Sequence, residues 1–231
     1  MKKIIIPFFC VVLFSTSVAA QKTTAAPAKT EAVKSKLTPK EVIDKYLTAL
    51  GGKDKLESVK SIVMENTISG AALPGEITMT TKKMGNKFKS EQFFMGQKAA
   101  SQYFDGEKGY MEQMGNKSEI PADKLGDLKN GKIIDALGYD YTKFKDVTTE
   151  KIDGKDYNVL TSDKGKFYFD ASTGLLYKAD AKEGTAFTKD YLTVDGIKFP
   201  SLIEAQGGGQ TMTIKTTKVT INSGVTDADF K

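Results

Sequence analysis

The sequence predicts an α+β protein built on one large antiparallel sheet with a few helices against it. From Ser61 onward, apolar and polar residues alternate with a period of two in run after run, and short turn sequences separate the runs. A helical pattern precedes the first run, and the stretch from Ile120 to Asp140 breaks the alternation with one or two further helices. Because strands joined by short turns pair antiparallel, the runs are expected to form one meander.

The first twenty residues have the parts of a secretory signal peptide. Lys2 and Lys3 precede an apolar run from Ile4 to Phe14, and small residues end at Ala20. The run is about eleven residues long, whereas a helix needs roughly twenty to cross a bilayer. Cys10, the only cysteine, lies inside this run, where a lipid-attachment site is not expected. We therefore predict export and cleavage after Ala20.

Two further segments follow the predicted signal peptide. Residues 21–37 are rich in Lys, Thr, Ala and Pro without apolar periodicity, which is typical of a flexible linker. The β-rich domain is predicted to span residues 38–231 and to begin with a helix. Thr38 and Glu41 have the spacing of a capping box, and Gly51 offers the left-handed backbone that ends a helix.

The alternating runs predict about eleven strands. Strand twist accumulates over so many strands, so the sheet is expected to curl toward a barrel or half-barrel with a concave face. Three consecutive glycines at 207–209 are expected to form a mobile connection between strands. The predicted strands lie near residues 61–69, 75–84, 86–95, 98–104, 108–114, 144–152, 156–162, 166–170, 175–181, 185–194 and 210–221.

The composition argues against catalysis and against nucleic-acid binding. The chain contains no histidine, and its cysteine leaves with the signal peptide, so neither a Ser–His–Asp nor a Cys–His arrangement can form. All 34 basic residues are lysines, and the chain therefore lacks the guanidinium groups that read base edges. We expect no enzymatic activity, no metal, no cofactor and no nucleic-acid partner. The acidic pairs Asp105 with Glu107 and Asp153 with Asp156 are predicted to serve turns.

The alternation also indicates a candidate ligand-binding face. Residues two apart on a strand point to the same side of a sheet, and methionine makes an apolar lining adaptable. The same residues are equally compatible with an ordinary packed core. The predicted lining of an apolar cavity on the concave side is Ile62, Met64, Ile68, Ile77, Met79, Phe88, Phe94, Val159, Phe167, Phe169, Phe187 and Tyr191.

Several segments resemble a known family. They are Ala-Leu-Gly-Gly-Lys-Asp-Lys-Leu at 49–56, Val-Lys-Ser-Ile at 59–62, Phe-Tyr-Phe-Asp at 167–170, Asp-Gly-Ile-Lys-Phe-Pro at 195–200 and the acidic end of the chain at 220–230. In type and order they resemble the LolA-like outer-membrane lipoprotein-sorting proteins of Bacteroidetes-type bacteria. The resemblance covers most of residues 41–230, and its motifs are mainly turns and sheet edges.

The resemblance implies an incomplete β-barrel whose concave face is covered by a few helices. It also implies a periplasmic carrier or binding protein, with an apolar cavity that receives lipid or lipoprotein acyl chains and a membrane-associated protein that loads or receives the cargo. Carriers of this family use an arginine to tie the helical lid to the sheet. This chain has no arginine, and the sequence leaves open whether a lysine takes that place.

Two alternatives remain beside the carrier. A binding module of the same shape would sense or store a hydrophobic small molecule. A non-catalytic interaction protein would instead use the outer face of the sheet against a membrane or a protein.

Overall fold

The structure is a computed structural model that describes residues 32–230. The predicted signal peptide, its cleavage site and residues 21–31 of the predicted linker lie outside the described residues.

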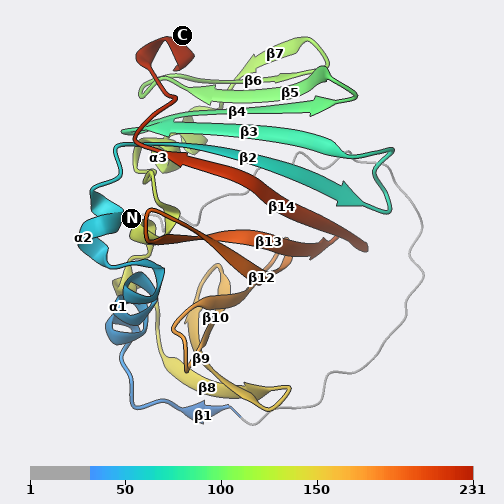
Figure 1. Cartoon of the computed structure of the whole chain (residues 1–231). Coiled ribbons are helices and arrows are strands. Elements are labelled where there is room, and N and C mark those ends of the chain that lie inside the picture. Colours follow the sequence, from blue (N-terminus) through green and yellow to red (C-terminus); the bar gives the residue numbers. More distant parts are fainter. Residues whose placement is uncertain (1–31, 231) are drawn as a thin grey trace.

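Fourteen strands form one antiparallel sheet (Figure 1). Its order is β1-β8-β9-β10-β11-β12-β13-β14-β2-β3-β4-β5-β6-β7, so two meanders meet where β14 pairs with β2. Within residues 32–230 no pairing joins β1 to β7, and the curved sheet stays open. The predicted curved antiparallel sheet is therefore confirmed. The strands are β1 Val33–Lys34, β2 Ser61–Gly70, β3 Ile77–Met84, β4 Lys87–Phe94, β5 Gln97–Phe104, β6 Gly109–Gln113, β7 Asn116–Glu119, β8 Val147–Ile152, β9 Lys155–Ser162, β10 Gly165–Asp170, β11 Leu176–Ala181, β12 Gly184–Val194, β13 Ile197–Gly207 and β14 Gln210–Ile221.

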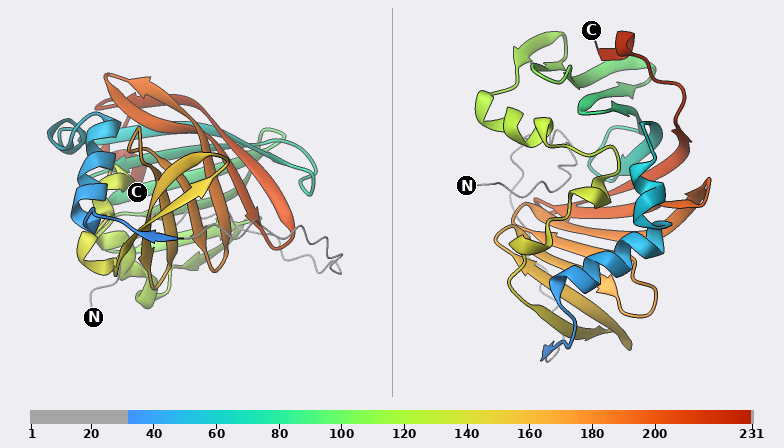
Figure 2. Two further views of the ribbon diagram at one scale, coloured as in Figure 1. Left: turned by 90° about the horizontal axis from the view of Figure 1, so that it is seen from below. Right: turned by 90° about the vertical axis from the view of Figure 1, so that its left-hand side faces the viewer.

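The helices lie along one end of this sheet. In Figure 1, α1 and α2 lie along the left-hand end, and in Figure 2 the chain between β7 and β8 runs beside them. We call the face of the sheet that contacts α1 the inner face and the opposite face the outer face. None of the helices in residues 32–230 is both long and apolar enough to cross a membrane. The helices are α1 Pro39–Leu50, α2 Lys53–Glu57 and α3 Ala122–Lys129, with short 3-10 turns η1 Asp135–Gly138, η2 Tyr141–Lys143 and η3 Asp227–Phe230.

Helix α1 begins and ends as the sequence predicts. The Glu41 amide donates to the Thr38 hydroxyl over 3.3 Å, and the Glu41 carboxylate accepts from the Thr38 amide over 2.7 Å. At the other end Gly51 has φ of 132°, and a Cβ there would lie 2.5 Å from the Gly196 carbonyl oxygen. Glycine is therefore required both by the backbone angle and by the close approach of the β12–β13 turn.

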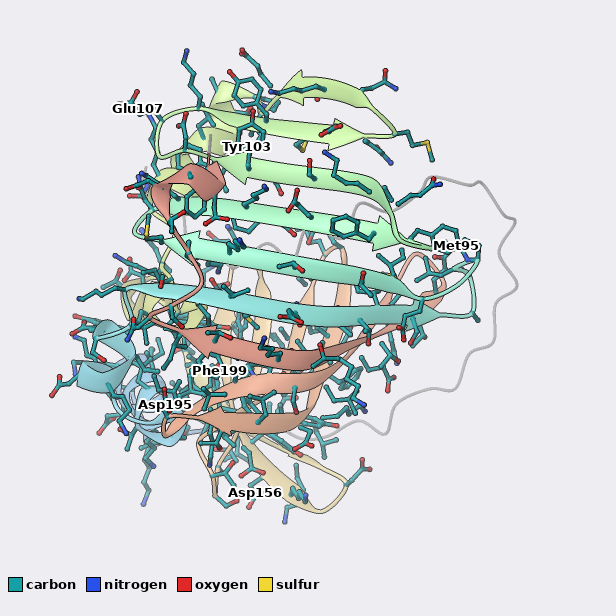
Figure 3. The ribbon with its side chains drawn as sticks, turned by 45° about the horizontal axis from the view of Figure 1, so that its top comes forward. Met95, Tyr103, Glu107, Asp156, Asp195 and Phe199 are labelled. Carbon is teal, nitrogen blue, oxygen red and sulfur yellow. The ribbon has the colours of Figure 1, made fainter. Side chains whose placement is uncertain are left out.

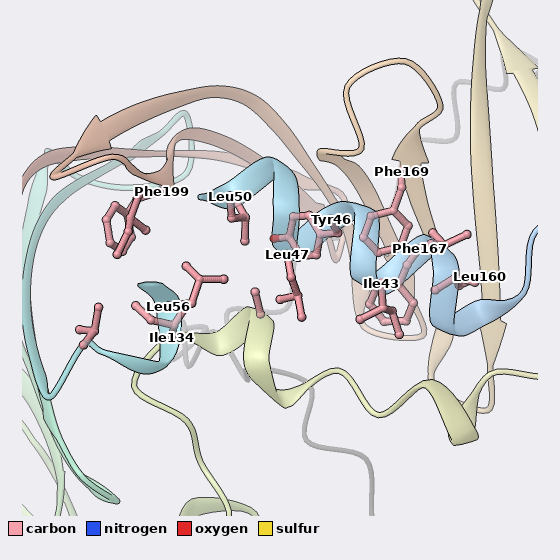
Figure 4. Close-up of a cluster of buried hydrophobic side chains, with 14 of the residues drawn as sticks. Ile43, Tyr46, Leu47, Leu50, Leu56, Ile134, Leu160, Phe167, Phe169 and Phe199 are labelled. Atoms are coloured by element: carbon pink, nitrogen blue, oxygen red, sulfur yellow. The ribbon is translucent and has the colours of Figure 1, made fainter. Parts of the chain in front are cut away.

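The main core lies between α1 and the inner face, as Figure 4 shows. Helix α1 presents its apolar stripe to side chains of β2, β9, β10 and β13, with η1 closing the remaining side. Burial of this stripe, rather than helix propensity, stabilises a helix of this length. The buried stripe consists of Val42, Ile43, Tyr46, Leu47 and Leu50.

Three strands were not predicted. Strand β13 was not predicted because Pro200 interrupts its apolar run. In the structure, Pro200 pairs with Tyr191 of β12 next to a register shift in β12, and proline is tolerated at such irregularities. At the predicted connection 207–209, Gly207 ends β13, and Gly208 and Gly209 form the turn that connects it to β14. Strand β7 is short and polar, and β1 pairs Val33 with Thr149, so the end of the predicted linker joins the sheet.

Candidate ligand-binding face

Strand register places the seven predicted residues of β2, β3 and β4 on the inner face. Residues directly opposite each other in a ladder share a face. Ile68 lies opposite Ile77, which lies opposite Phe94, and Ile62 is connected to Phe88 through Lys83 in the same way. Met64 and Met79 occupy alternate positions of the same strands. The seven are Ile62, Met64, Ile68, Ile77, Met79, Phe88 and Phe94.

The second half of the predicted lining divides between the two faces. Phe167, Phe169 and Tyr191 pack into the core under α1. Val159 and Phe187 were predicted to line the inner face, but both lie on the outer face. Tyr168 is on the outer face, between the inward-facing Phe167 and Phe169. Val159 pairs directly with Tyr168, and Lys178 of β11 pairs with both Tyr168 and Phe187.

Two physical reasons explain this difference. On β9 the inner position belongs to the next residue, Leu160, which faces Phe167. On β12 the register shifts between Thr188 and Asp190 and again between Asp190 and Tyr191, so Phe187 and Tyr191 face opposite sides although they are four residues apart. A bulge reverses alternation in a way that sequence periodicity does not reveal.

The inner face is closed at the helix end and more open toward the other end. Ile62, Phe167 and Phe169 are buried in the main core. Further from the helices a second, smaller cluster consists of Ile68, Met79 and Ile214, and its apolar neighbours remain partly exposed. Phe88 is also partly exposed, but it lies at the helix end, level with Ile62. Among the other partly exposed apolar residues that β2, β3, β4, β13 and β14 place on this face are Met64, Ile77, Phe94, Ile203 and Met212, and these five we call the open inner face.

Sequence reasoning missed the part of this face that comes from β13 and β14. Ile203 pairs with Ile214, which pairs with Ile68, so these strands extend the apolar surface next to β2. The signal was present in the alternation of 210–214, but no face was assigned to that run, and β13 was not recognised.

A polar contact separates the two apolar clusters. The Thr216 hydroxyl lies 2.9 Å from Asn66 Oδ1 and 3.0 Å from the Pro200 carbonyl oxygen, and both side chains are buried. Buried hydrogen-bonded groups of this kind specify one arrangement of neighbouring strands. The contact thus lies between the main core and the second cluster, and Met64, on the core side of it, is already partly exposed.

Aromatic side chains fill the space beneath α1. The Tyr139 ring contacts Tyr46, Phe167 and Phe169 edge-on, with centroids 5.7–6.2 Å apart. The Tyr191 hydroxyl donates to the Leu176 carbonyl oxygen over 2.8 Å. Burial raises the pKa of both Tyr46 and Tyr139. The protein's own aromatic side chains therefore occupy this part of the inner face.

An ion pair ties the helical segment to the sheet. Lys83 lies on the inner face of β3, and its Nζ is 2.5 Å from Asp135 Oδ1 in η1. The lysine side chain is only 17% exposed, so its stem packs beneath the segment that it holds. A lysine thus makes a contact between sheet and covering segment in a chain without arginine.

The acidic pairs considered in the sequence serve turns and ion pairs. Asp105 Oδ1 accepts from the amides of Glu107 and Lys108 over 2.8 and 2.7 Å, and these bonds lower the pKa of Asp105. Asp156 lies 3.6 Å from the Lys151 ammonium group. Across residues 32–230, no three acidic, histidine or cysteine side chains gather as metal ligands.

Solved structures share this fold. A DUF1329 family protein from Desulfovibrio piger superposes with a TM-score of 0.58 at 14% identity, covering 84% of this chain and 98% of its own. A proposed outer membrane lipoprotein-sorting protein domain from Vibrio parahaemolyticus superposes with a TM-score of 0.52 at 12% identity, covering 81% and 97%. No protein-family model and no curated protein matches the sequence. The predicted resemblance to lipoprotein-sorting proteins is confirmed for the fold.

Proposed function

We propose that this protein is a periplasmic carrier or binding protein that holds an acyl chain, of a lipid or a lipoprotein, along the open inner face. The observation that carries the proposal is the change in burial along one side of the sheet. At the helix end the inner face is a packed core, and farther along the same strands apolar side chains stay partly exposed.

An acyl chain suits this surface because it is long, flexible and wholly apolar. Partly exposed apolar side chains lose contact with water when such a chain lies across them, at roughly 25 cal/mol for each Å² buried. Methionines at two of the positions adapt to the shape of the chain. The similarity in fold to the Vibrio parahaemolyticus lipoprotein-sorting domain supports this class of ligand. We further propose export to the periplasm and exchange of cargo with a membrane-associated protein.

The proposed test compares two neighbouring residues of β3 that face opposite sides. Ile77 lies on the open inner face, and Thr78 points to the outer face. Ile77→Gln should weaken the binding of a fluorescent fatty acid several-fold, because it places an amide where the acyl chain would lie. Binding is measured by fluorescence titration, with melting temperatures recorded for each variant.

Thr78→Gln is the matched control and should bind the fatty acid as the parent does. Equal binding by Ile77→Gln, Thr78→Gln and parent would contradict the proposed site. In that case an interaction module that uses the outer face becomes the better account.

A further inference from the structure

Two turns at one end of the β2–β7 meander carry exposed apolar side chains that are not part of the inner face. They are Met95 between β4 and β5 and Met114 between β6 and β7, which we call the apolar tips. Leu73 in the β2–β3 connection packs instead against the second cluster. Met95 is 85% exposed and Met114 is 68% exposed. Figure 3 shows Met95 at the far end of its hairpin, away from Glu107 and Asp195.

The two methionines occupy backbone positions that favour other residues. Met95 and Met114 have φ of 51° and 49°, in the left-handed region that Gly, Asn and Asp adopt most readily. Asp153 and Asp195 have the same φ of 49° in two-residue turns at the opposite, helix end of the sheet. The chain thus uses aspartate in this turn geometry at one end and methionine at the other.

At this end of the sheet, the turns of the two meanders differ in charge. The β9–β10 and β11–β12 turns, which lie at the same end but on the other meander, have Asp163-Lys164 and Lys182-Glu183 at their tips. By contrast Met95-Gly96 and Met114-Gly115 contain no charged side chain, while the β2–β3 connection carries the exposed Glu76. The two uncharged apolar turns therefore both belong to the β2–β7 meander.

Each exposed methionine is followed in the next strand by a lysine on the outer face. Lys98 follows Met95 by three residues, and Lys117 follows Met114 by the same number. Both lysines lie on the outer face, where Lys98 Nζ is 2.8 Å from Glu112 and Lys117 Nζ is 4.3 Å from the Tyr110 ring centroid. At about 3.4 Å of rise per residue, each ammonium group sits roughly 5–10 Å behind its methionine.

This exposure does not follow from the local sequence alone. Met84-Gly85-Asn86-Lys87 repeats the Met-Gly-Asn-Lys sequence found at Met114, yet there Met84 closes β3 and is partly buried, while Gly85 and Asn86 form the turn. A shift of one residue in the turn therefore separates a packed methionine from an exposed one.

We propose that the apolar tips insert into the surface of a lipid bilayer, with Lys98 and Lys117 at the level of anionic headgroups. Two narrow points suit a fluid bilayer, because a stable contact with a folded protein buries about 800 Å² of complementary surface on each partner. Apolar side chains in the acyl boundary with cations behind them are the arrangement by which interfacial segments bind anionic membranes. The proposal goes beyond ligand binding by the inner face and is tested without a ligand.

The absence of tryptophan from the sequence permits a direct test. The exported protein, with its N-terminus established by mass measurement, is prepared as Met95→Trp and, as a matched control at the helix end, as Asp153→Trp. Each carries a single tryptophan and is mixed with vesicles of phosphatidylglycerol and phosphatidylethanolamine. Emission of Met95→Trp should shift to the blue and be quenched by lipids brominated near the headgroup end of the acyl chain. Emission of Asp153→Trp should stay unchanged.

A second variant tests the need for the methionines. Met95→Asp combined with Met114→Asp restores the residue that the chain uses in the same geometry elsewhere, so the melting temperature should be that of the parent. Vesicle binding should weaken about tenfold or more, because two apolar side chains no longer leave water. Binding of a fluorescent fatty acid without vesicles should be unchanged, which separates this proposal from the proposed function.

The proposal is overturned if vesicles leave the Met95→Trp emission unchanged or quench both tryptophans equally. It is also overturned if the double aspartate variant binds vesicles as the parent does. Equal binding to vesicles of pure phosphatidylcholine would remove the role of Lys98 and Lys117. Failure of the parent to bind fatty acid in solution would count against the proposed function and leave the membrane contact untouched.

Discussion

At the scale of single residues, the inner face changes from core to partly exposed surface within one strand. Ile62 is 1% exposed and lies in the main core, whereas Met64, two residues further along β2 on the same face, is partly exposed. The two side chains therefore differ in the space around them although they look alike in sequence.

This difference predicts unequal responses to the same polar substitution. Ile62→Gln should lower the free energy of unfolding by about 3 kcal/mol or more, because it buries an amide among apolar side chains. Met64→Gln should lower it by about 1 kcal/mol or less, since its amide reaches water. Denaturant unfolding of the two variants measures both values. Equal losses would mean that the closed core extends past Met64.

The ion pair between Lys83 and Asp135 gives a second prediction at this scale. Lys83→Met keeps the stem of the side chain and removes the charge, so hydrogen exchange should become faster in residues 133–145 while the rest of the sheet keeps its protection. A double-mutant cycle with Asp135→Asn should give a coupling of about 0.5–1 kcal/mol, because the aspartate is partly exposed to solvent. Unchanged exchange would show that apolar packing alone holds this segment.

Sequence reasoning succeeded for residues wherever alternation was uninterrupted. The seven lining residues of β2–β4 share the inner face as expected. It failed for Phe187 because the irregularity at Asp190 reverses the alternation, and for Val159 because either face of β9 carries apolar residues. Burial on both faces removes the contrast on which the period-two pattern depends.

At the scale of elements, the short C-terminal turn η3 is held by charge as well as by packing. Phe230 is buried, and Asp227 and Asp229 make ion pairs with Lys87 and Lys82 on the outer face of β4 and β3. The hydrogen bond from Lys82 is the main cause of a lowered pKa for Asp229, followed by the bond from the Thr226 amide.

This lowered pKa predicts how attachment of η3 depends on pH. The folded state favours the charged carboxylate, so the stabilising contribution is fully present above the unfolded pKa of 3.8 and is lost as the pH falls through the lower folded value. Asp229→Asn should therefore reduce the fall in the free energy of unfolding below about pH 4, measured by denaturant titrations at several pH values. A pH profile identical to that of the parent would contradict the assignment.

Elements with strong local signals were predictable and those with interrupted signals were not. The capping box at Thr38 and the glycine at position 51 place both ends of α1 correctly. The β6–β7 turn forms at Met114 and Gly115, within the predicted run 108–114, because methionine is not a residue from which a left-handed backbone is expected. The strand pairing forces methionine into a backbone conformation that it rarely adopts, so the exposed methionine tips could not be predicted from residue preferences.

At the scale of the whole molecule, two meanders have different surroundings. The β8–β14 meander wraps around α1 and supplies much of the main core, while β2–β7 extends beyond it with a partly exposed inner face (Figure 1). The sequence predicted the curvature from strand number and twist. It did not predict how the helices divide the inner face, because that division depends on contacts between residues far apart in the chain, such as Lys83 with Asp135.

The most direct test of the central claim is native mass spectrometry of the protein released gently from the envelope of its own cells. The account predicts a population heavier than the protein by the mass of one lipid or acylated ligand, and this population should shrink in Ile77→Gln and persist in Thr78→Gln. A protein that arrives without bound mass in all three forms, under conditions that preserve known lipid complexes, would contradict the claim that the inner face holds an acyl chain.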